Sequence, residues 1–333
     1  MEKEIYKVVL ADNESKPVEI EKQILSEINV NFVYLNTMDK DVIISEAKDA
    51  DALMCTYAKI SPSVIAELKK CRVIVRYGIG VDNIDVEAAS KAGIWIANLP
   101  DYAILEVTNH TLALILALNR KLFVYNVGIR KGLWGFSMGV PIERLDEQII
   151  GLVGFGNIAQ CVAQKAQGIG LKVISFDPFI DENYMNNKGV DKIHNLDDLL
   201  KKSDFVSLHA PLNETTKKSI GEHELKIMKP GAYLINTGRG GLIDEPILIK
   251  ALKENWIGGA GLDVYSQEPI NQDNELLKLE NVILTPHTAY YSEKSKQIQQ
   301  KMAAESVLDV LKGGKPRSLF NKNLLNKYGK NIN

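Results

Sequence analysis

Three polar residues in the second half of the chain, each following an apolar segment, have side chains suited to the reduction of a ketone. Arg239 follows AYLINTG, Glu268 follows AGLDVYSQ and His287 follows NVILTP. Because ligand sites in an open parallel sheet lie at the carboxyl ends of its strands, we expect the three side chains to converge there. Arg239 is suited to hold a carboxylate, and His287 to donate a proton. A carboxylate such as Glu268 beside the imidazole would stabilise its charged form.

Each of these residues also fits a structural role when taken singly, as a surface charge, a turn residue or a cap. A second histidine, His209 in the segment LHAP, also follows a predicted strand and is the alternative proton donor. His110, His194 and His223 fall in helical or connecting segments, where we expect structural or exposed positions.

The segment from Gln148 to Pro178, QIIGLVGFGNIAQCVAQKAQGIGLKVISFDP, has the order strand, glycine turn, helix, strand and acid. Gly154 permits a tight turn, and Gly156 lets the backbone approach a pyrophosphate at the start of the helix. Ala159 permits close packing of helix and strand, and Asp177 stands where a carboxylate accepts hydrogen bonds from a ribose. Glycines at this spacing also occur by chance, but the elements around them favour a dinucleotide site.

In the first half, the segment RYGIGVDNID places two glycines just after the apolar run VIVR. Ile79 and Gly80 are in a position to offer backbone N–H groups to a substrate carboxylate, with Arg76 close by. An ordinary turn between strand and helix explains the same residues equally well. The loop around Tyr57 and the side chain of Tyr290 are expected to shape the pocket for the rest of the substrate.

The elements that must position these residues alternate between short apolar strands and helices. Strands are expected at 7–11, 31–35, 52–55, 73–76, 94–98, 149–153 and 173–176, and in FVSLHAP, AYLINTGRGG, GGAGLDVY and VILTPHTAYY. Helices are expected at about 17–28, 41–47, 104–125, 196–202, 222–228 and 292–311, after Ser61, Asp85 and Asp244, and between the glycine turn and Gly168. This alternation predicts parallel sheets covered by helices. Since the six strands from Ile149 onward make a full dinucleotide-binding sheet, the first hundred residues must form a separate domain, completed by the C-terminal tail.

Length and composition agree with two domains of a globular protein. The chain has 333 residues, of which 45% are hydrophobic and 25% charged, and that length is long for one core. A formal net charge of −2 gives no basic surface for nucleic acid or an anionic membrane. Three widely spaced cysteines in apolar segments are typical of reduced, buried thiols in the cytosol. No export signal is recognisable at the N-terminus, and the helix expected at 104–125 is too polar for a membrane span. We therefore expect a cytoplasmic protein.

Over essentially its whole length the chain resembles the D-isomer-specific 2-hydroxyacid dehydrogenases. The motifs that carry this resemblance are RYGIGVDNID, GLVGFGNIA with FDP, SDFVSLHAPLNETT, MKPGAYLINTGRGGLIDE, GLDVYSQEP and TPHTAYYSE. The resemblance implies an α/β fold with two Rossmann-like, doubly wound parallel-sheet domains. The coenzyme domain, residues 101–289, would be inserted into a discontinuous substrate domain, residues 1–100 and 290–333. It also implies NAD as cofactor and homodimers built around the coenzyme domains.

The resemblance implies a catalytic set of Arg239, Glu268 and His287. The implied cofactor contacts are Gly154, Gly156, Asn157, Ile158, Asp177, His209, Ala210, Pro211, Thr237, Gly238, Arg239, Asp263, His287 and Ala289. The expected substrate contacts are Tyr57, Arg76, Ile79, Gly80, Arg239 and Tyr290. No metal site is expected.

Within the family, TPHTAYYSE and KPRSLFNKN resemble most the branch that contains the C-terminal binding proteins, which are NAD-sensing corepressors, and their bacterial relatives. Tyr290 stands where those corepressors carry tryptophan, and Ala159 replaces the more frequent third glycine. Glu268, where formate dehydrogenases of the superfamily carry glutamine, argues against formate.

The predicted function is NADH-dependent reduction of a small 2-oxo acid to a D-2-hydroxy acid. The alternative is a corepressor-like binding module, controlled by NAD(H), with incidental dehydrogenase activity. A hydrolase that uses bound NAD would share the architecture but does not explain the spacing of Arg239, Glu268 and His287. Pyruvate, glyoxylate, hydroxypyruvate, branched or aromatic 2-oxo acids and, in the oxidative direction, 3-phosphoglycerate all remain open as substrates.

Overall fold

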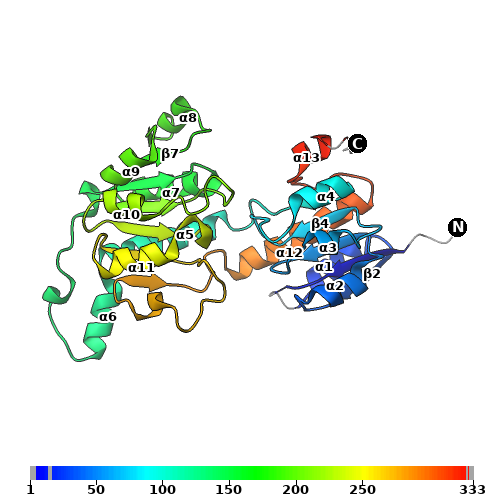
Figure 1. Cartoon of the computed structure of the whole chain (residues 1–333), viewed down its shortest axis with the longest axis horizontal. Helices are drawn as coiled ribbons and strands as arrows, with labels where there is room; N and C mark the ends of the chain where they lie inside the picture. Colours follow the sequence, from blue (N-terminus) through cyan, green and yellow to red (C-terminus); the bar gives the residue numbers. More distant parts are fainter. Residues whose placement is uncertain (1–4, 14–16, 328, 330–333) are drawn as a thin grey trace. The chain divides into compact units, whose positions relative to one another are not determined.

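The chain folds into two compact units, each built around one parallel sheet (Figure 1). The computed structural model describes residues 5–13, 17–327 and 329. Unit 1 comprises Met1–Ala103 and Ser292–Asn333, and unit 2 comprises Ile104–Tyr291. Unit 1 thus combines the two ends of the chain, blue to cyan and orange to red in Figure 1, while unit 2 is continuous.

The described part of unit 1 contains a five-stranded parallel sheet in the order β2-β1-β3-β4-β5. Its strands are β1 (Tyr6–Leu10), β2 (Val30–Tyr34), β3 (Ala52–Cys55), β4 (Val73–Arg76) and β5 (Trp95–Ala97). Its helices are α1 (Glu19–Leu25), α2 (Lys40–Ala47), α3 (Pro62–Ile65), α4 (Val86–Ala92), α12 (Glu293–Leu311) and α13 (Lys322–Lys327). Strand order reverses between β1 and β3, which makes the carboxyl ends of these two strands the switch point of this sheet.

The long helix α12 of the C-terminal segment packs into unit 1 against α1 and β4. It begins with a capping box in which Ser292 and Ser295 exchange hydrogen bonds between side chain and backbone. Buried Met302, Ala303 and Val307 lie along α12. The C-terminal segment therefore supplies part of the hydrophobic core of unit 1.

The described part of unit 2 contains a seven-stranded parallel sheet in the order β12-β11-β10-β9-β6-β7-β8. Its strands are β6 (Ile149–Val153), β7 (Lys172–Phe176), β8 (Asp191–Lys192), β9 (Phe205–Leu208), β10 (Tyr233–Asn236), β11 (Gly259–Leu262) and β12 (Val282–Leu284). Its α-helices are α5 (Ile104–Asn119), α6 (Leu122–Arg130), α7 (Asn157–Gly168), α8 (Glu182–Asn186), α9 (Leu196–Lys202), α10 (Glu222–Ile227) and α11 (Glu245–Lys253). Short 3-10 helices are η1 (Phe136–Gly139), η2 (Leu145–Glu147), η3 (Gly240–Leu242) and η4 (Glu275–Lys278).

Helices cover both faces of this sheet, as the near-continuous burial of its central strands requires. On one face, α5 and α7 pack over a core that includes Ile115, Val162 and Phe205. On the other face, α9, α10 and α11 pack over a core that includes Leu199, Leu225 and Leu248. The predicted doubly wound α/β class is confirmed, and the strands expected in unit 1 lie within one or two residues of those observed. The two-residue strand β8 was not predicted, because so short a segment carries no periodic signal.

The single helix expected at 104–125 is wrong, because the chain bends between α5 and α6. Lys121, at the N-cap of α6, has a φ of 52°, a left-handed conformation that interrupts helical hydrogen bonding. In the described part of the chain, no single helix is long and apolar enough to span a membrane. The helices α5 and α6 taken together are long and apolar enough by length and composition, but a bend of 61° separates them.

The three cysteines are all free thiols. Cys55 and Cys71 are buried, and burial raises the pKa of each to about 12, which keeps both thiols protonated and unreactive. Cys161 on α7 is only half-buried, so the expectation that all three are buried is wrong for this residue. Its position on an amphipathic helix, and not in a strand, explains the partial exposure.

Candidate active site

The glycine turn after β6 lies at the point where the strand order of the second sheet reverses, between β6 and β9. Gly154 has a φ of 94°, and its N–H donates to Phe176 O at 2.8 Å. A Cβ on Gly154 would lie 2.9 Å from the carbonyl carbon of His209, so only glycine lets the two turns approach. A Cβ on Gly156 would meet no described atom within 4 Å. The space above the start of α7 therefore fits a phosphate group held by backbone N–H groups.

Asp177 at the end of β7 is fixed against this turn. Its Oδ2 accepts a hydrogen bond from Phe155 N at 2.8 Å and its Oδ1 one from Phe179 N at 2.9 Å. Each carboxylate oxygen keeps a further lone pair for a ligand. Ala159 on α7 is fully buried, as expected for the small residue at that motif position. Asn157 is exposed and Ile158 half-buried on the first turn of the same helix.

His287 and Glu268 form the close contact expected of a proton donor and its partner carboxylate. The His287 Nδ1 lies 2.6 Å from Glu268 Oε2, and Tyr265 N donates to Glu268 Oε1 at 3.0 Å. Burial raises the pKa of Glu268, but the hydrogen bond and charge of His287, the N–H of Tyr265 and the charge of Arg239 outweigh it, so the pKa is lowered. Glu268 is therefore ionised at neutral pH. The backbone of His287 has a φ of 53°, and its N–H donates to Asp263 O at 2.8 Å.

Arg239 lies in the tight turn after β10. Its Nη1 donates to Gly238 O at 2.8 Å, and its carbonyl accepts from the buried side chain of Asn236 at 2.8 Å. A Cβ on the next residue, Gly240, would lie 1.9 Å from Tyr265 O. Glycine at this position thus brings the Arg239 turn against the turn that carries Glu268, and the expected convergence of the three side chains at one sheet edge is observed.

A buried polar network beside this site includes His110, for which the sequence predicted only a structural or exposed position. Asp263 is fully buried and accepts hydrogen bonds from Thr285 Oγ1 at 2.5 Å, Thr288 N at 2.9 Å and Ala289 N at 2.8 Å. His110 on α5 lies with its Nε2 2.9 Å from Thr285 Oγ1 and 3.7 Å from Asp263 Oδ1. The helical pattern predicts α5 but not the strand end that it faces. The contact between His110 and Thr285 therefore could not be predicted from the sequence.

The rival proton donor, His209, has a different environment. Its Nε2 lies 2.9 Å from Ser207 Oγ, and burial lowers the pKa of its imidazole to about 4. The ring is therefore neutral near pH 7, which disfavours it as an acid. Tyr290 instead lies beside the other candidate, with its ring edge-on to His287 at a centroid distance of 6.3 Å.

The remaining expected cofactor contacts lie at the carboxyl ends of β9 and β10. Ala210 and Pro211 follow His209 in the turn that abuts Gly154. Thr237 is buried, with its Oγ1 2.9 Å from Thr111 Oγ1 on α5.

The substrate contacts expected in the first half all lie at the carboxyl edge of the sheet of unit 1. Tyr57 follows β3 and is exposed, while Arg76, Ile79 and Gly80 at the end of β4 are half-buried. A Cβ on Gly78 would lie 1.5 Å from Arg76 Nη1, so glycine at that position leaves room for the guanidinium.

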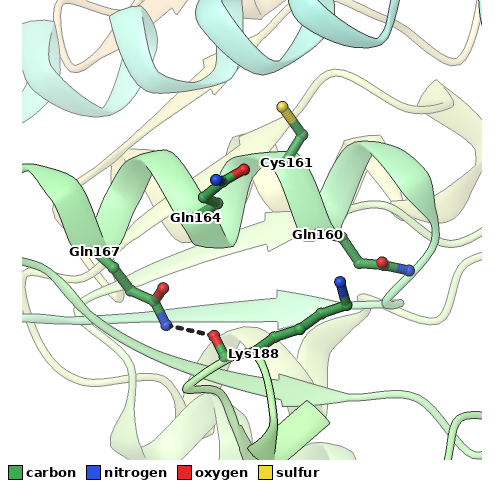
Figure 2. A pocket seen from close by; sticks show the side chains of 5 residues that line it. All are labelled: Gln160, Cys161, Gln164, Gln167 and Lys188. Carbon is green, nitrogen blue, oxygen red and sulfur yellow. Dashed lines mark hydrogen bonds between the residues drawn. The ribbon is translucent and has the colours of Figure 1, made fainter. Parts of the chain in front are cut away.

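A separate pocket of about 350 Å³ opens on the outer side of α7 (Figure 2). Its lining consists of Gln160, Cys161, Gln164, Gln167 and Lys188. The Gln167 amide donates to the carbonyls of Lys188 at 3.1 Å and Gly189 at 2.7 Å, which ties α7 to the turn before β8. The lining contains neither imidazole nor carboxylate, so this pocket does not offer the acid–base groups present at the strand ends.

Comparison with known proteins identifies the family. The model of the "D-isomer specific 2-hydroxyacid dehydrogenase, NAD binding domain" matches residues 112–289, more than half of the chain. A glyoxylate reductase of Korarchaeum cryptofilum is 39% identical over 291 residues, covering 86% of this chain and 87% of the relative. A D-3-phosphoglycerate dehydrogenase of Methanocaldococcus jannaschii is 37% identical over 285 residues, covering 85% of this chain and 54% of the relative. The chain therefore belongs to the D-isomer specific 2-hydroxyacid dehydrogenase family.

A solved structure agrees with this assignment. The D-lactate dehydrogenase of Aquifex aeolicus, complexed with NAD and lactic acid, has a TM-score of 0.84 and 29% identity, covering 92% of this chain and 96% of that one. The protein is thus an NAD-dependent oxidoreductase that acts on the CH–OH group of 2-hydroxy acids. The corepressor-like alternative is not favoured, since these relatives have the names of enzymes. They do not single out the branch that contains the C-terminal binding proteins, so that narrower resemblance stays a prediction.

Proposed function

We propose that this enzyme reduces a small 2-oxo acid to the D-2-hydroxy acid, with Arg239, Glu268 and His287 as the catalytic set. The observation that carries the proposal is the 2.6 Å contact between His287 Nδ1 and Glu268 Oε2 at the sheet edge that also carries Arg239. When bound, reduced NAD supplies the hydride that adds to the carbonyl carbon.

His287 delivers the proton that the carbonyl oxygen takes up in the same step. With Nδ1 held by Glu268, the ring orientation is fixed and Nε2 is the nitrogen that faces the substrate. The ionised Glu268 stabilises the imidazolium before transfer, and water restores the proton afterwards. In the oxidative direction the same nitrogen accepts the proton of the hydroxyl group.

Arg239 binds the substrate carboxylate and polarises the neighbouring carbonyl. Its guanidinium carries five N–H donors, and the bond from Nη1 to Gly238 O restrains the plane of the group. A planar fork held in this way suits two parallel hydrogen bonds to a carboxylate. We assign further substrate contacts to Tyr290 and, in unit 1, to Tyr57, Arg76, Ile79 and Gly80.

For the cofactor, the N–H groups at the start of α7 would hold the pyrophosphate and Asp177 the adenosine ribose. We place further contacts at the turns after β9, β10 and β12. These are the His209–Pro211 turn, Thr237 to Arg239, Asp263, His287 and Ala289. The free thiols fit a reducing compartment, and we propose the cytosol.

Glyoxylate is the first substrate to test, because several of the similar proteins have the name glyoxylate reductase. The assay is NADH oxidation with about a dozen 2-oxo acids, together with NAD reduction on 3-phosphoglycerate and D-lactate. We expect turnover with at least one small 2-oxo acid, formation of the D isomer, and loss of turnover in His287→Gln. Absence of turnover across both panels in a sample that binds NADH would contradict the proposal.

We also propose that the enzyme is a homodimer joined through the segment from α6 to Val140. Large apolar side chains are exposed along it, namely Leu122, Phe123, Ile129, Leu133, Trp134, Phe136 and Val140. Trp134 is 91% exposed and Phe136 80%. At roughly 200 Å² for an aromatic side chain, Trp134 and Phe136 alone present roughly 300 Å² of apolar surface. One partner in a standard interface buries about 800 Å², so these two side chains and the aliphatic ones around them would supply a large share of it.

This segment is ordered by its own contacts and is not a loose loop. Tyr125 Oη donates to Phe136 O at 2.9 Å, and a Cβ on Gly139 would lie 2.6 Å from the Tyr125 ring. In Figure 1, α6 and the chain leading to β6 extend away from the body of unit 2. A rigid apolar projection of this kind is typical of an interface between subunits.

The mass in solution, measured by light scattering at micromolar concentration, tests this assignment. We expect a dimer for the wild type and a monomer for Trp134→Lys. Phe179→Lys is the matched control, because Phe179 is 92% exposed but lies outside the segment. A monomeric wild type, or a dimer unaffected by the change at Trp134, would show that the interface lies elsewhere or does not form.

A further inference from the structure

At the carboxyl edge of the sheet of unit 1, a buried carboxylate holds the loop after β3. Asp12, just after β1, is 7% exposed. Its Oδ1 accepts from Thr56 N at 3.0 Å and Ala58 N at 3.2 Å, and its Oδ2 accepts from Tyr57 N at 2.6 Å. The Thr56 hydroxyl also donates to Asp12 O at 3.2 Å. Three successive N–H groups of one loop thus converge on one carboxylate.

The carbonyls of the same loop are held from the other side. Asn83, in the segment after β4, donates through Nδ2 to Thr56 O at 3.3 Å and to Ala58 O at 2.8 Å. Ala58 itself is fully buried, whereas Tyr57 is 36% exposed. The backbone on both sides of Tyr57 is therefore fixed, and among residues 56–58 only the side chain of Tyr57 reaches the surface.

This arrangement sits at the switch point of the sheet, since β1 and β3 are adjacent and the strand order reverses between them. At the switch point of the sheet of unit 2, a Cβ on Gly156 in the turn after β6 would meet no described atom within 4 Å, so that turn leaves space for a ligand. In unit 1, the carboxylate of Asp12 takes up the loop N–H groups itself. The N–H groups of residues 56–58 are consequently not available to bind an anion. The side chain of Tyr57 is the part of the loop that can contact a ligand.

We propose that Asp12 is a positioning residue that fixes Tyr57 for substrate selection, acting through the backbone of residues 56–58. The inference rests on the proposed function, in which Tyr57 contacts the part of the 2-oxo acid that varies between substrates. Asparagine at position 12 has one acceptor oxygen and would present N–H donors to a loop that is itself composed of donors. The change therefore loosens the loop without removing any group of the catalytic set.

A matched control lies at the amino ends of the strands of the same sheet. Asp51, just before β3, is 9% exposed, and its Oδ2 accepts from Lys7 N at 2.9 Å. Asp51→Asn thus changes a comparably buried carboxylate of the same sheet, bonded to backbone N–H, away from the carboxyl ends of the strands. Loss of stability alone would affect both variants, whereas displacement of Tyr57 affects the Asp12 variant.

The experiment compares steady-state kinetics of the full-length enzyme and its Asp12→Asn, Asp51→Asn, Tyr57→Ala and Asp12→Asn/Tyr57→Ala variants. For Asp12→Asn we expect KM for the preferred 2-oxo acid to rise roughly tenfold or more, with kcat changed less than about threefold. NADH binding, followed by fluorescence, stays unchanged. Tyr57→Ala raises KM similarly, and the double variant adds little to either single change, as expected for two residues acting as one unit. Asp51→Asn keeps the wild-type KM.

Hydrogen exchange supplies a readout that does not depend on turnover. The amides of residues 56–58 should exchange faster in Asp12→Asn than in the wild type or Asp51→Asn. If Asp12→Asn does not fold, Asn83→Ala releases the loop carbonyls instead and must raise KM in the same way. An unchanged KM in the folded variant, or additive effects of the changes at Asp12 and Tyr57, would overturn the inference. A wild type that reduces no 2-oxo acid would instead refute the proposed function on which it rests.

Discussion

The choice between His287 and His209 as proton donor leads to a quantitative prediction. Burial lowers the pKa of His209 to about 4, so its ring is almost entirely neutral at pH 7. His287 is instead held by the ionised Glu268, with its Nδ1 2.6 Å from Glu268 Oε2. Losing a general acid typically costs about 10²–10⁴-fold in rate, or about 3–5 kcal/mol of transition-state stabilisation. We expect His287→Gln to show a loss of this size in kcat and His209→Gln to stay within about threefold of the wild type.

The assay is single-turnover NADH oxidation at saturating NADH and 2-oxo acid, so that weaker binding in either variant does not hide the chemical step. NADH affinity, measured separately by fluorescence, should be largely kept in His287→Gln. His209 is an expected cofactor contact, so some loss of NADH affinity in His209→Gln is compatible with the prediction. Near wild-type turnover in His287→Gln, together with a large loss in His209→Gln, would show that His209 and not His287 is the proton donor.

Four further outcomes follow from individual contacts. Glu268→Gln should make the alkaline fall of reductive kcat/KM begin at lower pH, and an unchanged pH profile would leave Glu268 as a turn residue. Because the pKa of His209 is lowered to about 4, below its value of about 6.5 in an unfolded chain, the unfolded state binds more protons between these values. The associated stability is complete above pH 6.5 and falls by about 3 kcal/mol down to pH 4. Urea titrations should show a smaller loss in His209→Gln. NADH should exceed NADPH by at least roughly tenfold in kcat/KM, about 1.4 kcal/mol, because Asp177 repels a 2′-phosphate and residues 178–182 contain no Lys or Arg. Asp177→Ala should narrow that gap by weakening NADH, and equal wild-type rates with both cofactors would contradict the assignment. Gly240→Ala, whose Cβ would lie 1.9 Å from Tyr265 O, should cost roughly 1–3 kcal/mol of stability, and a wild-type melting temperature would contradict the close approach.

Much of the architecture was predictable because its signals are local. Apolar runs of four or five residues, separated by caps such as Asp85, predicted the strands and their parallel pairing. The glycine turn after β6 and the acid after β7 predicted the cofactor site, since backbone freedom at Gly154 and a carboxylate at Asp177 are properties of single residues. Elements with weak local signals were missed, namely the short strand β8 and the break between α5 and α6. The break occurs at Lys121, which has a left-handed backbone, and lysine is not a residue type that predicts this conformation.

The sequence by itself determined which residue types stand at the ends of the strands. Once the sheet is parallel, its carboxyl ends share one edge, so Arg239, Glu268 and His287 had to lie near one another. Only the tertiary structure decided which side chains touch, because distances between segments far apart in the chain depend on packing. The pairing of His287 with Glu268, the burial that keeps His209 neutral, and the contact of His110 with Thr285 all arise in this way. The hydrogen bonds from the backbone of residues 56–58 to Asp12 also depend on packing, because they join residues 44 to 46 positions apart. Such a contact exists only after β1 and β3 pair side by side, and no spacing along the chain encodes it.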